Sequence, residues 1–129
     1  MRTETTFHLV GDLIGVNAVM VGPTGAADVM LILDTAAAMT TLVPSVAGSI
    51  GYTSDLRLGW SVTRTAAAEE RGYVVHSEVS TLGFTLPHRV VVADLGYGID
   101  GLLGINFLRH FNFEIRPAER RILVEKIAP

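Results

Sequence analysis

The stretch Leu31 to Leu42, "LILDTAAAMTTL", joins a run of aliphatic residues to one carboxylate, Asp34, which is followed by small residues and hydroxyls. The aliphatic run predicts a buried strand. An ionised carboxylate at the end of a buried strand is unfavourable unless another group compensates for its lost hydration. The rest of the chain must therefore supply a partner for Asp34, unless Asp34 is a turn acid that accepts hydrogen bonds from nearby backbone N–H groups.

Composition narrows the class of protein. The chain has 129 residues, of which 49% are hydrophobic, so we expect one folded domain over residues 1–129. Its 10 basic and 13 acidic residues give a net charge of -3, which offers no basic surface for nucleic-acid phosphates. The chain has no cysteine, which excludes disulfides, thiolate metal sites and cysteine nucleophiles.

The N-terminal sequence "MRTETTFHLVGDL" lacks the long apolar core of a secretory signal. Apolar runs elsewhere are interrupted well before the ~20 residues that a membrane span needs. We therefore expect a soluble protein without a membrane partner, and a cytoplasmic location is favoured.

Short β-branched and aliphatic runs bounded by Gly, Pro, Asp or Asn predict strands. The predicted strands are residues 7–10, 13–21, 28–33, 59–65, 73–82, 84–92, 101–103, 112–116 and 121–127. Two short helices are predicted: one begins at Pro44 and ends near Gly51, and the other runs from Ile105 to Phe111 with an apolar stripe. Many short strands with two minor helices predict an all-β fold, a small closed barrel.

A second segment, "DGLLGINFLRHF" at residues 100–111, combines with the first in a recognisable order. A strand ends in an acid turn, a hairpin with its tip near residues 66–72 follows, and an aliphatic-aliphatic-Gly sequence then leads into a helix. This order resembles the retropepsin-like aspartic protease family, including its bacterial single-domain members, over about residues 13–127. The family turn Asp-Thr/Ser-Gly-Ala is matched by Asp34, Thr35 and Ala37, with Ala36 in the glycine position, and the second signature is matched by Leu102, Leu103, Gly104 and Leu108.

The resemblance implies an aspartic endopeptidase that acts as a homodimer. Each chain would contribute one catalytic carboxylate, Asp34, so that the missing partner of Asp34 is its own copy across a two-fold axis. Two carboxylates in contact cannot both ionise easily, and they would share one proton and activate water for attack on a peptide bond. Thr35 would bond the opposing chain beneath the pair, and the last strand, residues 121–127, would build a sheet between the two copies.

The resemblance also implies the remaining site residues and partners. The substrate would be an extended peptide or protein segment covered by the hairpin, and no metal or other cofactor would be required. Substrate contacts are expected from Ala37, from the hairpin residues Ala66, Ala67 and Ala68, and from Leu103.

Alternatives remain open at this point. Ala36 crowds the floor of the site, which favours a catalytically weak or inactive module that dimerises or binds peptides. A small barrel that binds an apolar ligand as a monomer is a third hypothesis. The sequence "GYGIDG" at residues 96–101 fits a dinucleotide-binding pattern, but only 28 residues follow it, too few for that architecture. The four histidines do not form a pattern that indicates a metal site.

Overall fold

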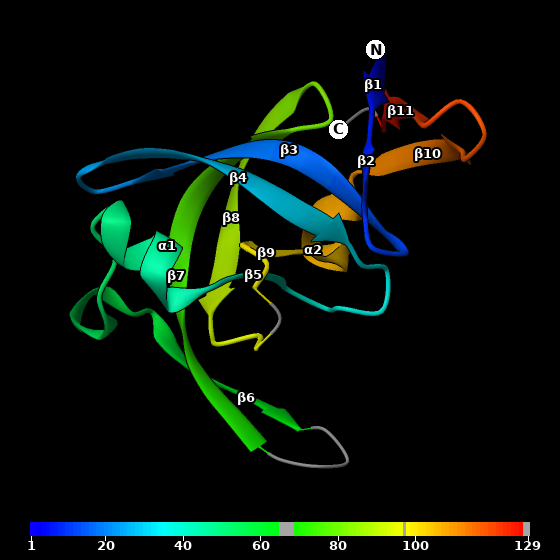
Figure 1. Ribbon diagram of the computed structural model, residues 1–129. Coiled ribbons are helices and arrows are strands. Elements are labelled where there is room, and N and C mark those ends of the chain that lie inside the picture. The colour runs from blue at the N-terminus through cyan, green and yellow to red at the C-terminus, as the bar shows by residue number, and fades with distance from the viewer. Residues whose placement is uncertain (65–68, 97, 128–129) are drawn as a thin grey trace.

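The computed structural model describes residues 1–64, 69–96 and 98–127 (Figure 1). Strands make up most of it. In chain order the elements are β1 (Arg2–Thr6), β2 (His8–Val10), β3 (Leu13–Gly22), β4 (Gly25–Leu33), β5 (Thr40–Leu42), α1 (Pro44–Ser49), a 3-10 helix (Ser54–Leu56), β6 (Gly59–Arg64), β7 (Glu69–Thr81), β8 (Phe84–Val92), β9 (Gly101–Leu103), α2 (Ile105–Leu108), β10 (Phe111–Arg116) and β11 (Arg121–Lys126). A membrane-spanning helix is absent from these ranges, where the longer α-helix has six residues.

Eight strands form one sheet in the order β2-β3-β4-β9-β5-β8-β7-β6. A further pairing between β3 and β7 closes this sheet on itself, so the predicted closed β barrel is confirmed. β3 shows the alternation that the closure requires: Val16 and Met20 are buried, whereas Val19 and Val21 are exposed.

A smaller sheet packs beside the barrel in the order β1-β11-β10. β11 is antiparallel to β1 along one edge and to β10 along the other. Both edges of the last strand are therefore occupied by strands of its own chain, and a second copy could extend this sheet only at the outer edge of β1 or β10.

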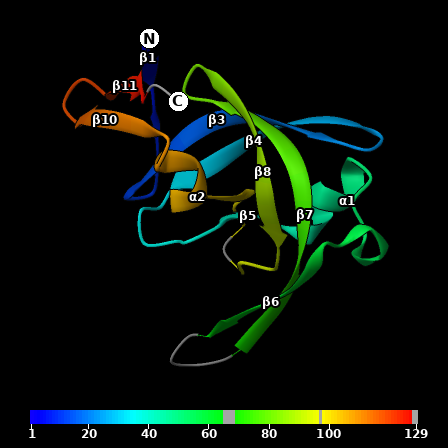
Figure 2. The same ribbon diagram turned by 180° about the vertical axis from the view of Figure 1, so that it is seen from behind.

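The core fills the barrel and the space between the two sheets. Phe107 of α2 has no exposed surface and packs between two aromatic neighbours, with ring centres 5.3 Å from Phe111 and 5.3 Å from His88. Ile122 and Val124 of β11 are each 1% exposed and join the same core. The short helix α2 therefore connects the barrel to the terminal sheet, as the two views show (Figure 2).

Several elements differ from those predicted: β4 begins at Gly25 and β7 at Glu69, both earlier than predicted, and the 3-10 helix was not predicted. Three further differences have a clear cause. β1 was missed because "RTETT" has no aliphatic residue, and its pairing with β11 supplies the stability that its own sequence lacks. β5 was missed because it has only three residues, two of them threonines. The second helix ends at Leu108 instead of continuing to Phe111, which begins β10 and pairs with Lys126.

Candidate active site

β4 and β9 place Asp34 at the end of a parallel strand pair. Leu31 pairs with Gly101 and Leu33 with Leu103, and the Asp34 N–H then donates to the Leu103 carbonyl at 3.1 Å. Gly101 permits this arrangement because a Cβ there would collide with the Thr41 carbonyl oxygen of the neighbouring strand β5. The backbone of Asp34 is thus fixed by the same ladder that forms the barrel.

The carboxylate of Asp34 lies in a tight turn. Its Oδ1 accepts a hydrogen bond from the Ala36 N–H at 2.9 Å, and the Ala37 N–H donates to the Asp34 carbonyl at 3.2 Å. Asp34 is half-buried, and both Thr35 and Ala36 are exposed. Across residues 1–64, 69–96 and 98–127, no side chain bonds to this carboxylate. The backbone cap expected of a turn acid is present, and the outward-facing surface of the turn is open.

Ala36 occupies the position that the resemblance assigns to glycine. In the described part of the chain, the non-glycine residues with positive φ are Leu82 and Arg120. Ala36 is not among them, so the turn does not require the left-handed backbone conformation that would disfavour alanine. The alanine adds a methyl group to an exposed surface without straining the backbone beneath it.

The segment after β9 binds the far side of the Asp34 turn. The Ile105 N–H donates to the Ala37 carbonyl at 2.8 Å, and the Asn106 N–H donates to the Ala38 carbonyl at 3.1 Å. Gly104 lies so close to this turn that a Cβ would come within 2.5 Å of the Met39 carbonyl carbon. The turn is therefore attached at its start by Leu103 and along its length by the first residues of α2.

Asn106 completes this attachment through its side chain. Its Oδ1 accepts from the Thr40 N–H at 2.7 Å and from the Thr40 hydroxyl at 3.0 Å, and its Nδ2 donates to the Arg89 carbonyl at 2.7 Å. The Thr40 hydroxyl in turn accepts from the Gly104 N–H at 3.1 Å. Thr40 has no exposed surface, so this small network satisfies polar groups that water does not reach.

Sequence reasoning did not single out Asn106. A signal was present, because an asparagine follows the Leu-Leu-Gly sequence by two residues and a threonine follows Asp34 by six. Neither residue is informative alone; their pairing becomes visible only when β5 and α2 are brought together.

The predicted substrate residues are distributed unevenly. Leu103 has no exposed surface and supports the turn from within the core, whereas Leu102, whose side chain alternates to the other face of β9, is half-buried. Ala37 is half-buried, and its carbonyl is used in binding α2. Ala66, Ala67 and Ala68 lie outside the described residues.

The hairpin of β6 and β7 projects from the barrel below the rest of the molecule (Figure 1). Gly72 allows β7 to pass close to the end of β8, because a Cβ there would lie 2.5 Å from the Val92 carbonyl oxygen. Trp60 is 63% exposed on this hairpin, and the Arg57 guanidinium stacks over its ring at 4.4 Å from the ring centre.

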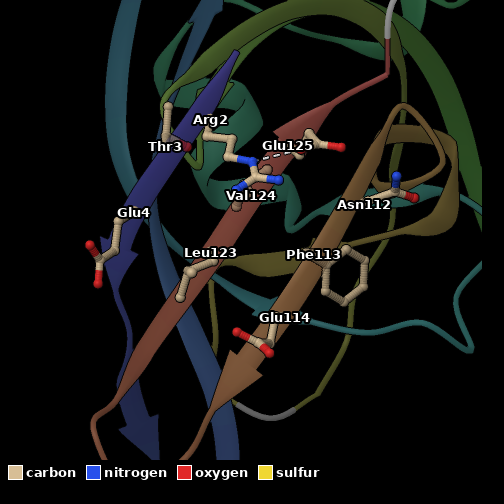
Figure 3. A pocket seen from close by; sticks show the side chains of 9 residues that line it. All are labelled: Arg2, Thr3, Glu4, Asn112, Phe113, Glu114, Leu123, Val124 and Glu125. Atoms are coloured by element: carbon tan, nitrogen blue, oxygen red, sulfur yellow. Dashed lines mark hydrogen bonds and ion pairs between the residues drawn. The ribbon is translucent and has the colours of Figure 1, made fainter.

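A hollow of about 560 Å³ lies elsewhere, on the outer face of the terminal sheet (Figure 3). Its charged side chains are already paired within the chain: Arg2 bonds Glu125 at 2.7 Å, and Arg116 bonds Glu114 at 2.9 Å. Asp34 does not line it. This hollow is open and polar-rimmed and is separate from the Asp34 turn. In the described ranges no three His, Asp or Glu side chains are grouped in a way that would hold a metal ion.

Comparisons with known proteins agree with this geometry. The family model described as "Aspartyl protease" matches residues 18–107, and the chain therefore belongs to the aspartyl protease family. A search of curated proteins found no match.

Solved structures show the fold within that family. A retropepsin-like aspartic protease from Rickettsia conorii superposes with a TM-score of 0.72 at 18% identity, covering 96% of this chain and 91% of that one. The EIAV protease, solved with the inhibitor HBY-793, gives a TM-score of 0.62 at 15% identity over 79% of this chain and 90% of its own. The retroviral protease-like domain of Ddi1 from Leishmania major gives 0.59 at 12% identity over 90% and 94%. The fold is that of a retropepsin-like aspartic protease.

Proposed function

We propose that the protein is an aspartic endopeptidase whose active site forms when two copies bring their Asp34 turns together across a two-fold axis. The observation that carries the proposal is the state of Asp34 itself. The backbone of its turn is attached to β9 and α2 on the inner side. Within the described residues, its carboxylate accepts a hydrogen bond only from the Ala36 N–H. An acid held this rigidly at an open surface suits a site that a second copy completes.

In such a pair the two carboxylates share one proton, because placing two negative charges in contact is unfavourable. The ionised carboxylate accepts a proton from a bound water molecule, and the protonated one donates to the carbonyl oxygen of the peptide bond. Water then attacks the carbonyl carbon directly, and the tetrahedral intermediate breaks down to two peptides without an acyl-enzyme. No metal or other cofactor takes part.

The other predicted residues have supporting roles. Thr35 is exposed beside Asp34, where its hydroxyl would bond the opposing copy and fix the angle between the two carboxylates. Leu102, half-buried on β9, replaces Leu103 as the residue of that pair able to contact the substrate. The hairpin of β6 and β7 would cover the bound peptide and exclude water.

The test is the Asp34→Asn substitution, assayed by cleavage of a peptide library between pH 4 and 6. Asparagine keeps the size of the side chain and can still accept the Ala36 N–H, so the fold should persist. Loss of the acid–base group should lower turnover by about 10²- to 10⁴-fold. The matched control is Asp55→Asn in the exposed 3-10 helix, which should cleave like the wild type. Equal turnover of both variants would refute the assignment of Asp34.

A dimeric site adds a second expectation. Specific activity should fall on dilution, because neither copy alone holds a complete pair of carboxylates. Analytical ultracentrifugation at the same concentrations should show the dimer separating over the range in which activity is lost. Activity that is independent of concentration in a species of monomer mass would contradict the shared site.

Ala36 favours a second candidate, a dimerising or peptide-binding module with little catalysis. Its methyl group projects from the exposed surface that two copies would share. The Ala36→Gly variant together with a pepstatin-like transition-state mimic separates the two candidates. Tight binding of the mimic indicates a catalytic site, since such mimics bind far more tightly than substrates. No binding by either form would favour the module.

A further inference from the structure

His88 is a titratable side chain to which the proposed mechanism gives no role. It lies on the face of β8 that also carries the buried residues Phe84 and Val90, because side chains alternate along a strand. The ring centre of His88 lies 5.3 Å from that of Phe107 in α2. Figure 2 shows α2 next to β8, so the two rings join these elements where they pack together.

Only Nδ1 of His88 has a hydrogen-bond partner within the described residues. It lies 3.4 Å from the Leu86 carbonyl oxygen, and because a carbonyl only accepts, the hydrogen of the neutral ring is assigned to Nδ1. Nε2 is enclosed and has no partner in the same ranges. A second proton must therefore attach at Nε2, where no acceptor faces it. An enclosed nitrogen of this kind calls for an explanation, because buried polar groups are normally hydrogen-bonded.

The groups around His88 oppose a positive charge on its ring. Burial is the main cause that lowers the pKa of His88, and repulsion from His110, after α2, and from His76, on β7, lowers it further. These effects outweigh the backbone hydrogen bond at Nδ1, which raises the pKa. α2 itself contains no titratable residue. The exposed charged residues on or beside the same elements are Glu78, Arg89 and Arg109. None of them bonds to His88 within the described chain, so the position favours a neutral imidazole.

α2 connects His88 to the Asp34 turn. Phe107 has no exposed surface, so its packing fixes the position of this short helix. The residue after His88, Arg89, accepts a hydrogen bond from the Asn106 Nδ2 at 2.7 Å, which gives β8 a second contact with α2. The first two residues of α2 donate backbone hydrogen bonds to the Asp34 turn at 2.8 and 3.1 Å. A movement of α2 away from β8 would therefore pull on the segment that carries Asp34.

Protonation at Nε2 should displace the ring of His88. A charged N–H that is enclosed without an acceptor loses the hydration that it would have in water, which is unfavourable. A cation–π contact with Phe107 would offset only part of this loss. His88 is half-buried, so rotation of its side chain brings the charged nitrogen to water. The rotation removes the ring from Phe107 and leaves one side of α2 without its packing partner.

We propose that His88 is a positioning residue whose protonation releases α2 from β8 and thereby loosens the Asp34 turn. Neutral His88 keeps the turn attached, and the attachment is lost as the pH falls below about 6.5, the ordinary pKa of histidine. The inference rests on the proposed function in one respect, which is that the loosened turn loses cleavage activity. The release of α2 itself needs no catalysis.

An NMR titration of the full chain with Asp34→Asn tests the release, because this variant removes the titration of Asp34. Spectra from pH 7.5 to 5 follow the His88 ring together with the backbone N–H groups of Ile105 and Asn106. Both N–H signals should shift with the midpoint of the His88 ring, and their hydrogen exchange, corrected for the intrinsic effect of pH, should become several-fold faster below it. The Val124 N–H, in the terminal sheet, is the internal control and should not follow this midpoint. Signals of α2 that are independent of His88 would overturn the proposal.

The pH profile of cleavage distinguishes a positioning role from a purely structural one. His88→Gln keeps a polar side chain that cannot become charged, and His88→Phe removes the enclosed nitrogen. With each profile normalised to its own value at pH 7, wild-type activity should fall several-fold further by pH 5 than that of either variant. The matched control is His8→Gln, at an exposed histidine on β2, which should keep the wild-type profile. Wild-type profiles for both His88 variants would refute the positioning role. If one of these variants does not fold, the other and the NMR titration decide the question.

The two proposals fail differently. If no peptide in the library is cleaved at any pH but the α2 signals of the Asp34→Asn protein follow the His88 ring, the protease function falls and the release of α2 stands. If the wild type cleaves peptides and the His88 variants keep its pH profile, the positioning role falls and the protease function stands.

Discussion

Replacing Asn106 by leucine tests whether its side chain holds the Asp34 turn in place. Leucine has nearly the same shape but loses three hydrogen bonds: two from Thr40 to Oδ1 and one from Nδ2 to the Arg89 carbonyl. A typical hydrogen bond contributes about 1 kcal/mol net, and an unpaired buried donor costs about 1–3 kcal/mol. The Thr40 N–H is left unpaired in a residue with no exposed surface, whereas water can reach the Arg89 carbonyl. We expect the free energy of unfolding to fall by about 3 kcal/mol.

Urea denaturation followed by circular dichroism measures this loss. With an m-value of about 1.5 kcal/mol per molar urea, the midpoint should fall by about 2 M. Asn112→Leu, on the exposed face of the edge strand β10, is the matched control and should change stability by less than about 0.5 kcal/mol.

A double-mutant cycle with Thr40→Val isolates the pair. Because both substitutions remove members of one network, their effects should not add, and the coupling should exceed about 0.5 kcal/mol. If Asn106→Leu costs less than about 1 kcal/mol and the coupling is zero within error, the network does not hold the turn, and the reasoning fails.

Three further predictions follow from individual positions. Gly104→Ala should destabilise the fold by about 3 kcal/mol, because the new Cβ would lie 2.5 Å from the Met39 carbonyl carbon. A loss below about 1 kcal/mol in urea titration would show that the turn can shift freely. Gly48→Ala should instead stabilise it by about 0.5–1 kcal/mol, since Gly48 lies in α1 with open space around its Cα, and an unchanged or lower urea midpoint would contradict this. Burial lowers the pKa of His88, whose Nε2 is enclosed without a partner in the described structure, so the unfolded chain binds this proton more readily. Stability should therefore fall as pH drops below about 6.5, by at most about 1.4 kcal/mol per pH unit. In melting curves from pH 7.5 to 5, His88→Phe should remove this part of the pH dependence. The control substitution His8→Gln, at an exposed site, should not.

The barrel was predictable from sequence because its strands carry their own signal. Phe84–Val92 and Gly101–Leu103 have the predicted bounds, since β8 follows Gly83 and ends in three consecutive valines, and Leu102 and Leu103 lie between two glycines. The Asp34 turn and the Leu-Leu-Gly sequence were likewise visible, because both are local patterns. What the sequence could not show is which residues meet across the fold.

The missed features all depend on such long-range pairing. β1 is polar along its length and forms because β11 lies beside it. Every β1–β11 pair joins residues at least 115 positions apart in the chain. Asn106 and Thr40 are 66 residues apart and bond only after β5 inserts between β9 and β8. Leu102 and Leu103 are the same type of residue, and only the alternation of side chains along β9 decides which of them is buried.

The position of β11 between β1 and β10 has a consequence for how the protein assembles. The last strand pairs with two strands of its own chain, so two copies that associate would not have to exchange this strand. Separation of two such molecules would leave the β1-β11-β10 ladder of each copy intact. If two copies form the proposed active site, the cellular concentration of the protein would control its activity, because separated copies each hold only one Asp34.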